Sequence, residues 1–352
     1  MPRIAPQGDR PVTQDALPIA DATTGPVFSV VVPMFNEAAG ILLLHTRLRA
    51  VMEGIGESWE VVYVNDGSRD ETLPTVEALR ERDPHVAVLN LSRNFGKEIA
   101  TTAGLDHTRG AAVIVIDADL QDPPEVIPAL VATWREGFDM VYGRRRVREG
   151  ETWLKTRTAA LFYRLMHNWG QVELPADAGD FRLMSRRSVD ALLRLREQHR
   201  FMKGLFAWVG FPSKPVLYDR APRAVGGTKW SYWKLWNLAI EGFTSFSVLP
   251  LKLASYIGVA VALVAALFGV VVVVRTLVWG DSPAGYPSLL VVVLLLGGTQ
   301  LIFLGVIGEY LGRVFNETKH RPLYLVERYL PARPAARGGA PAAGEQAPDA
   351  GA

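Results

Sequence analysis

Residues 113–125 read VIVIDADLQDPPE, a run of aliphatic side chains that ends in four acidic ones. An unbroken aliphatic run of this length is typical of a strand that is buried on both faces of a sheet. The acids are Asp117, Asp119, Asp122 and Glu125, and they would repel one another unless a cation lay beside them. The stretch therefore predicts a buried strand with a charged site at its carboxyl end.

Strand and helix patterns alternate on both sides of this stretch. Apolar strands are predicted at residues 27–35, 59–66, 86–92, 111–119 and 139–143. Helices are predicted between them at residues 37–53, 70–82, 96–107 and 123–136. Asp70 is the predicted N-cap of the second helix. This alternation indicates an α/β fold with a parallel sheet covered on both faces, in which ligands bind beyond the carboxyl ends of the strands.

Polar side chains follow each of the first four predicted strands. They stand in PMFNE, NDGS, RNFGK and DADLQ, at residues 33–37, 65–68, 93–97 and 117–121. One such group alone is typical of a turn and a helix cap, but four at the same edge of a sheet indicate a binding site. The sequence contains neither GxGxxG nor GxxxxGK[ST], so the dinucleotide fingerprint and the Walker phosphate loop are excluded.

The acidic cluster divides into two kinds of residue. Asp117 and Asp119, together with Gln121, fit Mg²⁺ or Mn²⁺, which take one or two carboxylates together with phosphate oxygens and water. Asp122 and Glu125 instead fit the start of the following helix, where negative charge is favourable. The predicted metal ligands are therefore Asp117, Asp119 and Gln121.

The composition narrows the class of protein. The chain has 352 residues and no cysteine, which excludes disulfides, thiolate metal sites and a cysteine nucleophile. A net charge of +2 gives no global electrostatic basis for binding nucleic acid. The 49% of hydrophobic residues are concentrated in the last third, which separates this chain from a typical soluble enzyme.

Two long apolar segments form a predicted transmembrane hairpin, at residues 253–275 and 288–311. Residues 253–274 carry no charge over about the length that spans a bilayer, and a pair of buried core helices is the alternative. Lys252 precedes the hairpin and Arg313 follows it, while the connector contains no lysine or arginine. This bias predicts that the catalytic domain and both termini are cytoplasmic; Arg275, near the outer end of the first span, counts against it.

The chain is accordingly divided into five predicted segments. They are a disordered arm without a signal-peptide core (1–26), a catalytic domain (27–230), an amphipathic juxtamembrane helix (231–250), the transmembrane hairpin (251–314) and a cytoplasmic tail (315–352). Residues 152–168 mix aromatic and basic side chains, as an interfacial helix does.

Eight ordered motifs carry a resemblance to a known family. They are VVPMFNE, VNDGSRDET, NFGKEIAT, DADLQDPPE, AGDFRLMSR, RFMKGL, GGTKWS and GEYLGRVFNETKHRP. In this order they resemble the inverting family 2 glycosyltransferases, in particular the polyprenyl-phosphate glycosyltransferases, which include dolichyl-phosphate mannose synthases and bactoprenol glucosyltransferases. The resemblance covers residues 28–328. It implies a GT-A (Rossmann-like) catalytic domain with interfacial helices, followed by a two-helix transmembrane hairpin.

The resemblance also implies roles for individual residues. The nucleotide-sugar pocket would contain Pro33, Asn36, Glu37, Asp66, Lys97 and Asp117. The metal and diphosphate would be held by Asp117, Asp119 and Gln121. Asp180 would be the catalytic carboxylate, aided by Asp119 and Arg182, and the acceptor phosphate would meet Arg144, Arg157 and Lys229. A lipid monophosphate is mostly dianionic at neutral pH, so we expect Asp180 to orient or weakly assist.

The leading functional prediction is transfer of a hexose, with inversion of the anomeric configuration, to undecaprenyl phosphate or another polyprenyl phosphate. The reaction is expected at the inner (cytoplasmic) membrane. UDP-glucose is the first expected donor; UDP-GlcNAc, UDP-galactose, GDP-mannose and a formylated aminoarabinose donor are alternatives. A processive polysaccharide synthase needs a channel, which one hairpin makes poorly. A non-catalytic nucleotide-sugar-binding protein would not need both Asp-x-Asp and the Asp180 segment. Related enzymes suggest a homo-oligomer.

Overall fold

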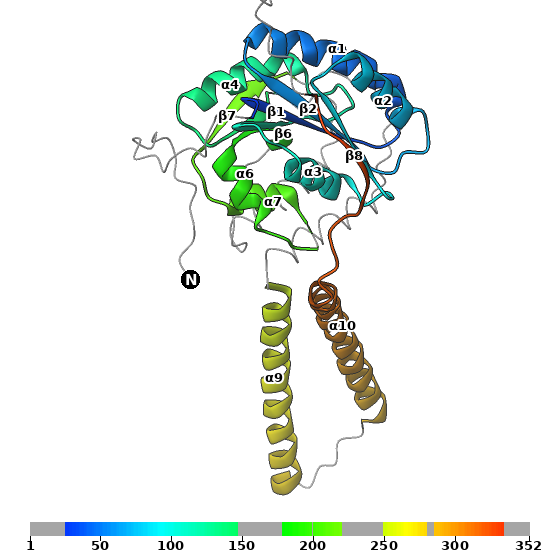
Figure 1. Cartoon of the computed structure of the whole chain (residues 1–352). Helices are drawn as coiled ribbons and strands as arrows, with labels where there is room; N and C mark the ends of the chain where they lie inside the picture. The colour runs from blue at the N-terminus through cyan, green and yellow to red at the C-terminus, as the bar shows by residue number, and fades with distance from the viewer. Residues whose placement is uncertain (1–24, 147–177, 199, 220–248, 280–284, 334–352) are drawn as a thin grey trace, which may run out of the picture.

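The structure is a computed structural model that describes residues 25–146, 178–198, 200–219, 249–279 and 285–333 (Figure 1). Several predictions concern segments outside the described residues. They are the N-terminal arm up to residue 24, the interfacial helix at 152–168, the juxtamembrane helix at 231–248, the end of the tail from 334, Arg157 and Lys229.

One eight-stranded sheet forms the centre of the molecule, with the order β7-β5-β6-β4-β1-β2-β3-β8. Its strands are β1 (Phe28–Met34), β2 (Trp59–Asn65), β3 (Val86–Leu91), β4 (Ala112–Val115), β5 (Met140–Arg145), β6 (Ala178–Ser185), β7 (Ser213–Tyr218) and β8 (Val326–Leu330). The central strands β3, β2, β1 and β4 are parallel, which confirms the predicted α/β core.

Helices cover both faces of this sheet (Figure 1). They are α1 (Ala38–Ile55), α2 (Thr72–Arg82), α3 (Lys97–Asp106), α4 (Ile127–Arg135), α6 (Arg186–Leu193) and α7 (Met202–Trp208). A short 3₁₀ turn, η1 (Pro124–Val126), precedes α4. The four helices predicted between the strands are therefore present, with small differences at their ends.

The predicted N-cap of α2 is wrong by one residue. Glu71 takes the N-cap position and makes no side-chain capping bond. Asp70 still satisfies a donor of this helix start, because its Oδ1 accepts the N–H of Thr72 at 3.1 Å. Its Oδ2 accepts the N–H of Ala38 at 3.4 Å, so Asp70 joins the starts of α1 and α2.

A proline is tolerated within the central strand β1 because the neighbouring strand β4 is short. The pairing of β1 with β4 ends at Val31, whose carbonyl accepts the N–H of Ile116. Pro33 lies two residues further on, so its nitrogen faces the same side, beyond the end of β4. The chain after β4 thus leaves the sheet here, and the Asp-x-Asp segment begins at this edge.

Two antiparallel strands correct the expectation of a parallel sheet. β6 lies between β4 and β5 and runs antiparallel to both, and β8 runs antiparallel to β3. In the register of β4 and β6, Val115 is opposite Arg182. The start of β6, with Asp180, therefore lies at the carboxyl end of β4, next to Asp117.

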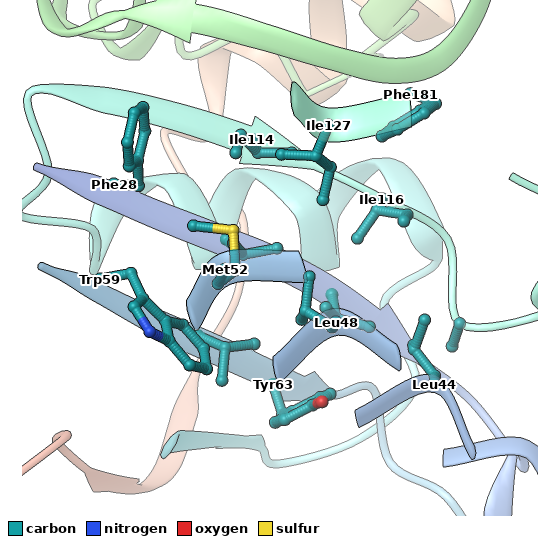
Figure 2. Close-up of a cluster of buried hydrophobic side chains, with 14 of the residues drawn as sticks. Phe28, Leu44, Leu48, Met52, Trp59, Tyr63, Ile114, Ile116, Ile127 and Phe181 are labelled. Atoms are coloured by element: carbon teal, nitrogen blue, oxygen red, sulfur yellow. The ribbon is translucent and has the colours of Figure 1, made fainter. Parts of the chain in front are cut away.

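Two apolar clusters hold helices to the sheet, one on each face. Figure 2 shows the larger one, in which side chains of α1 and η1–α4 meet those of the central strands. Its labelled members are Phe28, Leu44, Leu48, Met52, Trp59, Tyr63, Ile114, Ile116, Ile127 and Phe181. The second cluster joins α3, α6 and α7 to the opposite face. With both faces buried, the carboxyl edge is where the central strands present polar groups to a ligand.

The helices α9 (Leu249–Trp279) and α10 (Tyr286–Thr318) project away from the sheet (Figure 1). Their most apolar windows, Ala254–Val271 and Leu295–Thr318, have mean hydropathies of 2.3 and 1.3, and 0% of either window is buried. A core helix of a soluble protein would be mostly buried. By length and composition, each helix is able to cross a membrane.

After α10 the chain returns to the sheet and adds β8 at its edge (Figure 1). Leu325 accepts the N–H of Ser92 at 3.0 Å, and Arg333 donates its N–H to the carbonyl of Pro84 at 2.9 Å. Sequence reasoning assigned this segment to a tail and did not anticipate a strand. β8 connects the end of α10 directly to the sheet.

Candidate active site

The loop before α3 is anchored by a buried carboxylate. Phe95 and Gly96 donate their backbone N–H groups to Oδ1 and Oδ2 of Asp66, at 2.7 and 2.9 Å. Burial raises the pKa of Asp66, and these two hydrogen bonds offset only part of that effect. Gly96 has φ +98°, a left-handed value that favours glycine. Asp66 thus fixes the backbone immediately before Lys97, the first residue of α3.

Lys97 joins two carboxylates that come from different strands. Its Nζ lies 2.7 Å from Oδ2 of Asp117 and 2.7 Å from Oδ2 of Asp180. The lysine follows β3, Asp117 follows β4, and Asp180 belongs to the antiparallel strand β6. The side chains are 44% exposed for Lys97 and about one fifth exposed for the two acids, so the cluster is open to a ligand.

Electrostatics keep Asp180 ionised. Burial alone would raise its pKa, but the positive charges of Lys97, Lys203 and Arg182 outweigh burial and hold the pKa below its usual range. Burial and the charge of Asp180 raise the pKa of Asp117, against the opposing effect of Lys97. The pKa of Lys97 is raised, because the two carboxylates outweigh the burial that would lower it. A carboxylate held in this way is a weak base.

Two charged neighbours of Asp180 escaped sequence reasoning. Burial, together with the charge of Asp180, raises the pKa of Glu98 to about 7, while Lys97 and Lys203 oppose this shift. Lys203 belongs to α7, on the same face of the sheet as α3. Glu98 lies in the motif NFGKEIAT and Lys203 lies in RFMKGL. These motifs are the only signal for the two residues in the sequence.

Arg182 lies beneath the cluster and not at its open edge. The side chain is 3% exposed, and its Nη2 donates to the carbonyl of Gly179 at 2.8 Å. Its guanidinium carbon lies 3.4 Å from the ring centroid of Phe206, and burial lowers the pKa of Arg182 to about 10. These contacts hold the backbone that carries Asp180. The phosphate contact expected for Arg182 stays a prediction.

The Asp-x-Asp segment forms a tight turn. Oδ1 of Asp119 accepts the N–H of Gln121 at 3.1 Å, and Leu120 between them has φ +58°. Asp122, expected at the start of the next helix, is 2% exposed and accepts the hydroxyl of Tyr218 on β7. Asp122 directly precedes Pro123, the N-cap of η1, as expected, and it also joins this turn to β7.

Glu125 lies in the first turn of η1, as the sequence predicts. Its carboxylate also forms two bonds with Arg47 of α1, at 2.9 and 2.6 Å. This pair is exposed and lies outside the cluster around Lys97, which supports its separation from the predicted metal ligands.

The residues present fit a hard divalent cation as a partial set of ligands. Among the described residues, no group of three or more His, Cys, Asp and Glu side chains could hold a metal by itself. Asp117, Asp119 and Gln121 offer carboxylate and amide oxygens from a single turn. Mg²⁺ and Mn²⁺ characteristically bind to one or two carboxylates and complete their shells with phosphate oxygens and water.

The residues expected around the nucleotide meet at the carboxyl ends of β1 and β2. Asn36, with φ +56°, donates its N–H to Oγ of Ser68 at 3.0 Å, and its Oδ1 accepts the N–H of Arg69 at 2.9 Å. Glu37 donates its N–H to Oγ1 of Thr72 at 2.9 Å. Pro33 lies one residue before the end of β1 and Asp66 directly follows β2, so these four residues of the predicted nucleotide pocket lie at the same edge of the sheet.

The predicted acceptor residues are only partly described. Arg144 lies exposed on β5, opposite Ala178 of β6 and Leu217 of β7. Arg157 and Lys229 lie outside the described residues. The described chain therefore gives the position of one of the three basic residues, on the strand next to β6.

Sequence comparison reveals close relatives. The sequence model of glycosyl transferase family 2 matches residues 29–193. An uncharacterized glycosyltransferase of Synechocystis sp. is 51% identical over 308 residues, which cover 86% of this chain and 97% of that protein. The bactoprenol glucosyl transferase of Shigella phage SfV is 48% identical over 299 residues, which cover 85% of this chain and 97% of that protein.

The similarity to solved structures is weaker. Glucosyl-3-phosphoglycerate synthase from Mycobacterium tuberculosis, in complex with Mn²⁺, UDP and phosphoglyceric acid, is 20% identical with a TM-score of 0.45. The match covers 61% of this chain and 75% of that one.

Replacing Lys97 tests the electrostatics of the cluster. Lys97→Met leaves Asp117 and Asp180 in mutual repulsion, and we expect a loss of about 1–2 kcal/mol in the free energy of unfolding at pH 8. This is less than for a fully buried pair, because Lys97 is 44% exposed. Because the pKa of Asp180 is lowered in the folded protein, its ionised carboxylate stabilises the native state at neutral pH. This stabilisation is lost only in strong acid. In the variant both carboxylates gain protons more readily, so the deficit should shrink between pH 8 and pH 5.

Thermal unfolding in detergent with EDTA measures this deficit. Lys214→Met is the matched control, because it removes an exposed pair with Glu136 and should cost less than about 0.5 kcal/mol at either pH. A Lys97→Met deficit of equal size at pH 5 and pH 8 would contradict the account.

Proposed function

From the premise that the chain belongs to glycosyl transferase family 2, we propose that it transfers glucose from UDP-glucose to a polyprenyl phosphate, such as undecaprenyl phosphate, with inversion. The observation that carries the proposal is the 48% identity with the bactoprenol glucosyl transferase of phage SfV, over 299 residues. A match of this length necessarily includes α9 and the start of α10, so the similarity extends beyond the catalytic sheet.

Family membership confirms that the chain is a glycosyltransferase, as the motifs predict. Together with the mixed α/β sheet, it also confirms the GT-A class of the fold. The donor, the acceptor and the metal are the parts that we propose.

The acceptor chemistry agrees with the electrostatics around Asp180. A phosphate monoester has its second pKa near 6 and is mostly dianionic at neutral pH, so it attacks without a strong base. Lys97, Lys203 and Arg182 lower the pKa of Asp180 and make it a poor proton acceptor. We therefore assign Asp180 to orientation of the reacting groups, with Lys97 as the charge that holds it in place.

Departure of the nucleoside diphosphate requires positive charge. Asp117, Asp119 and Gln121 would hold Mg²⁺ or Mn²⁺, which when bound neutralises the charge that develops on the diphosphate. Lys97, at 2.7 Å from Asp117, supplies a fixed positive charge at the same edge. Pro33, Asn36, Glu37 and Asp66 would surround the base and ribose at the ends of β1 and β2.

The lipid acceptor requires a position at the membrane surface. We propose that α9 and α10 span the membrane as a hairpin, with the catalytic domain and both termini on the cytoplasmic side of the inner membrane. Support comes from β8, which follows α10 and pairs with β3, so the end of α10 must lie on the same side as the sheet. Arg144, together with Arg157 and Lys229, would meet the acceptor phosphate, and the active form would be a homo-oligomer.

A panel of donors tests the proposal directly. Purified protein in lipid, with undecaprenyl phosphate and Mg²⁺, is given each nucleotide sugar in turn, and lipid products are identified by mass spectrometry. We expect a hexosyl-phosphate lipid with UDP-glucose, and its loss in EDTA. If lipid product formed only from UDP-GlcNAc, UDP-galactose or GDP-mannose, the proposed reaction would stand but glucose would be the wrong sugar. If no donor gave a lipid product, the proposed function would be wrong.

Two acidic residues should respond differently to loss of charge. Asp119→Asn removes a proposed metal ligand, and we expect turnover to fall by about 100-fold or more. Asp180→Asn should cost no more than about tenfold, since an orienting group is not an obligatory base. Turnover measured at saturating UDP-glucose separates the two roles, and a larger loss for Asp180→Asn than for Asp119→Asn would reverse the assignment.

A further inference from the structure

Three polar side chains form a hydrogen-bonded chain from the edge strand β8 into the sheet. Nδ2 of Asn65 donates to Oδ1 of Asn90 at 2.7 Å, and Nδ2 of Asn90 donates to Oε2 of Glu327 at 2.7 Å. Asn65 on β2 and Asn90 on β3 are register partners, exposed by only 2% and 6%. Buried amides are costly unless they are hydrogen-bonded, so each member depends on the next.

Glu327 and the backbone N–H of Ser68 set the direction of this chain from its two ends. An ionised carboxylate only accepts hydrogen bonds, so Asn90 must turn its Nδ2 toward Glu327 and its Oδ1 toward Asn65. Asn65 must then turn its own Nδ2 toward Asn90. This leaves Oδ1 of Asn65 facing the N–H of Ser68, at 3.3 Å.

The chain ends in the loop that joins β2 to α2. Ser68 accepts the N–H of Asn36 through its Oγ at 3.0 Å, and Asn36 accepts the N–H of Arg69 at 2.9 Å. Asp66, the next residue after Asn65, holds the loop before α3. The orientation of Asn65 thus bears on the loop at residues 65–69, where the ends of β1 and β2 meet.

Glu327 is an unusual member of an edge strand. It is exposed, and the pairing of β8 with β3 is made by the backbone, so packing does not demand a carboxylate there. Its neighbour Arg328 pairs with Glu77 on the surface, as edge-strand charges ordinarily do. Glu327 instead bonds a buried amide, which gives it an effect inside the sheet.

We propose that Glu327 is a positioning residue for the donor nucleotide. By fixing the orientation of Asn90 and Asn65, it shapes the loop at residues 65–69 from the strand that follows the second apolar helix (Figure 1). The segment after α10 therefore contributes to donor binding as well as to the sheet. The inference rests on the proposed function, because it assumes that a nucleoside diphosphate binds at this loop.

Reversing the polarity of the chain tests the proposal. In E327K the new side chain only donates, so Asn90 must turn its oxygen outward and Asn65 must turn its amide nitrogen toward the N–H of Ser68. Two donors then face each other. We expect the Kd for UDP with Mg²⁺, and the KM for UDP-glucose, to rise about tenfold, while kcat and the melting temperature change little.

Two control variants isolate the hydrogen bond from the charge. E327Q can still accept from Asn90, and its Kd for UDP should stay within about twofold of the native value. V326K places the same new charge one residue away, on a side chain that is 40% exposed and makes no bond to Asn90, and should behave in the same way.

A double variant provides the rescue. In E327K/N90D, the carboxylate that replaces Asn90 accepts both from the new lysine and from Nδ2 of Asn65, so the native direction returns and UDP binding should recover. Any of three results would overturn the proposal. They are native UDP affinity in E327K, a loss of UDP affinity in V326K as large as that in E327K, and a lower melting temperature of E327K with an unchanged KM for UDP-glucose. Native protein that does not bind UDP would instead refute the proposed function on which it rests.

Discussion

One ammonium group holds two carboxylates together at the carboxyl edge of the sheet, and the rest of the site depends on it. Nζ of Lys97 lies 2.7 Å from both Asp117 and Asp180. Without that charge, two partly buried acids would repel each other, and burial would push protons onto them. With it, Asp180 stays ionised and is a poor base. This suits a reaction whose nucleophile is already an anion and whose leaving group needs positive charge.

The antiparallel strand β6 makes this interaction possible. β6 runs antiparallel beside β4, so its start meets the end of β4 and brings Asp180 to Asp117. Asp66 fixes the loop that carries Lys97, and Arg182 holds the backbone around Asp180 from below. The edge strand β8 then attaches the end of α10 to the same sheet. The expected donor site and the end of α10 are thereby attached to the same sheet.

The sequence predicts the parallel core because fully buried strands carry a continuous apolar signal, as in VIVID. It does not predict β6, where the buried Arg182 interrupts the apolar pattern, or β8, whose residues VERYL are largely exposed. Lys97 and Asp180 are 83 residues apart, and only the register of β6 brings them into contact. The predicted metal ligands were recognisable because they lie in one turn. Glu98, Lys203 and Glu327 were not, because their partners are distant in sequence.

Because the ligands of this edge are a partial set, we propose that it binds a metal ion only together with a nucleotide. Titration of Mn²⁺, followed by the EPR signal of the free ion with and without UDP, tests it most directly. Asp117, Asp119 and Gln121 supply only part of an octahedral shell, and Lys97 already lies against Asp117. The account predicts tight Mn²⁺ binding in the presence of UDP and weak binding in its absence. Tight binding of Mn²⁺ to the protein alone, or UDP binding that is unaffected by removal of the metal, would contradict it.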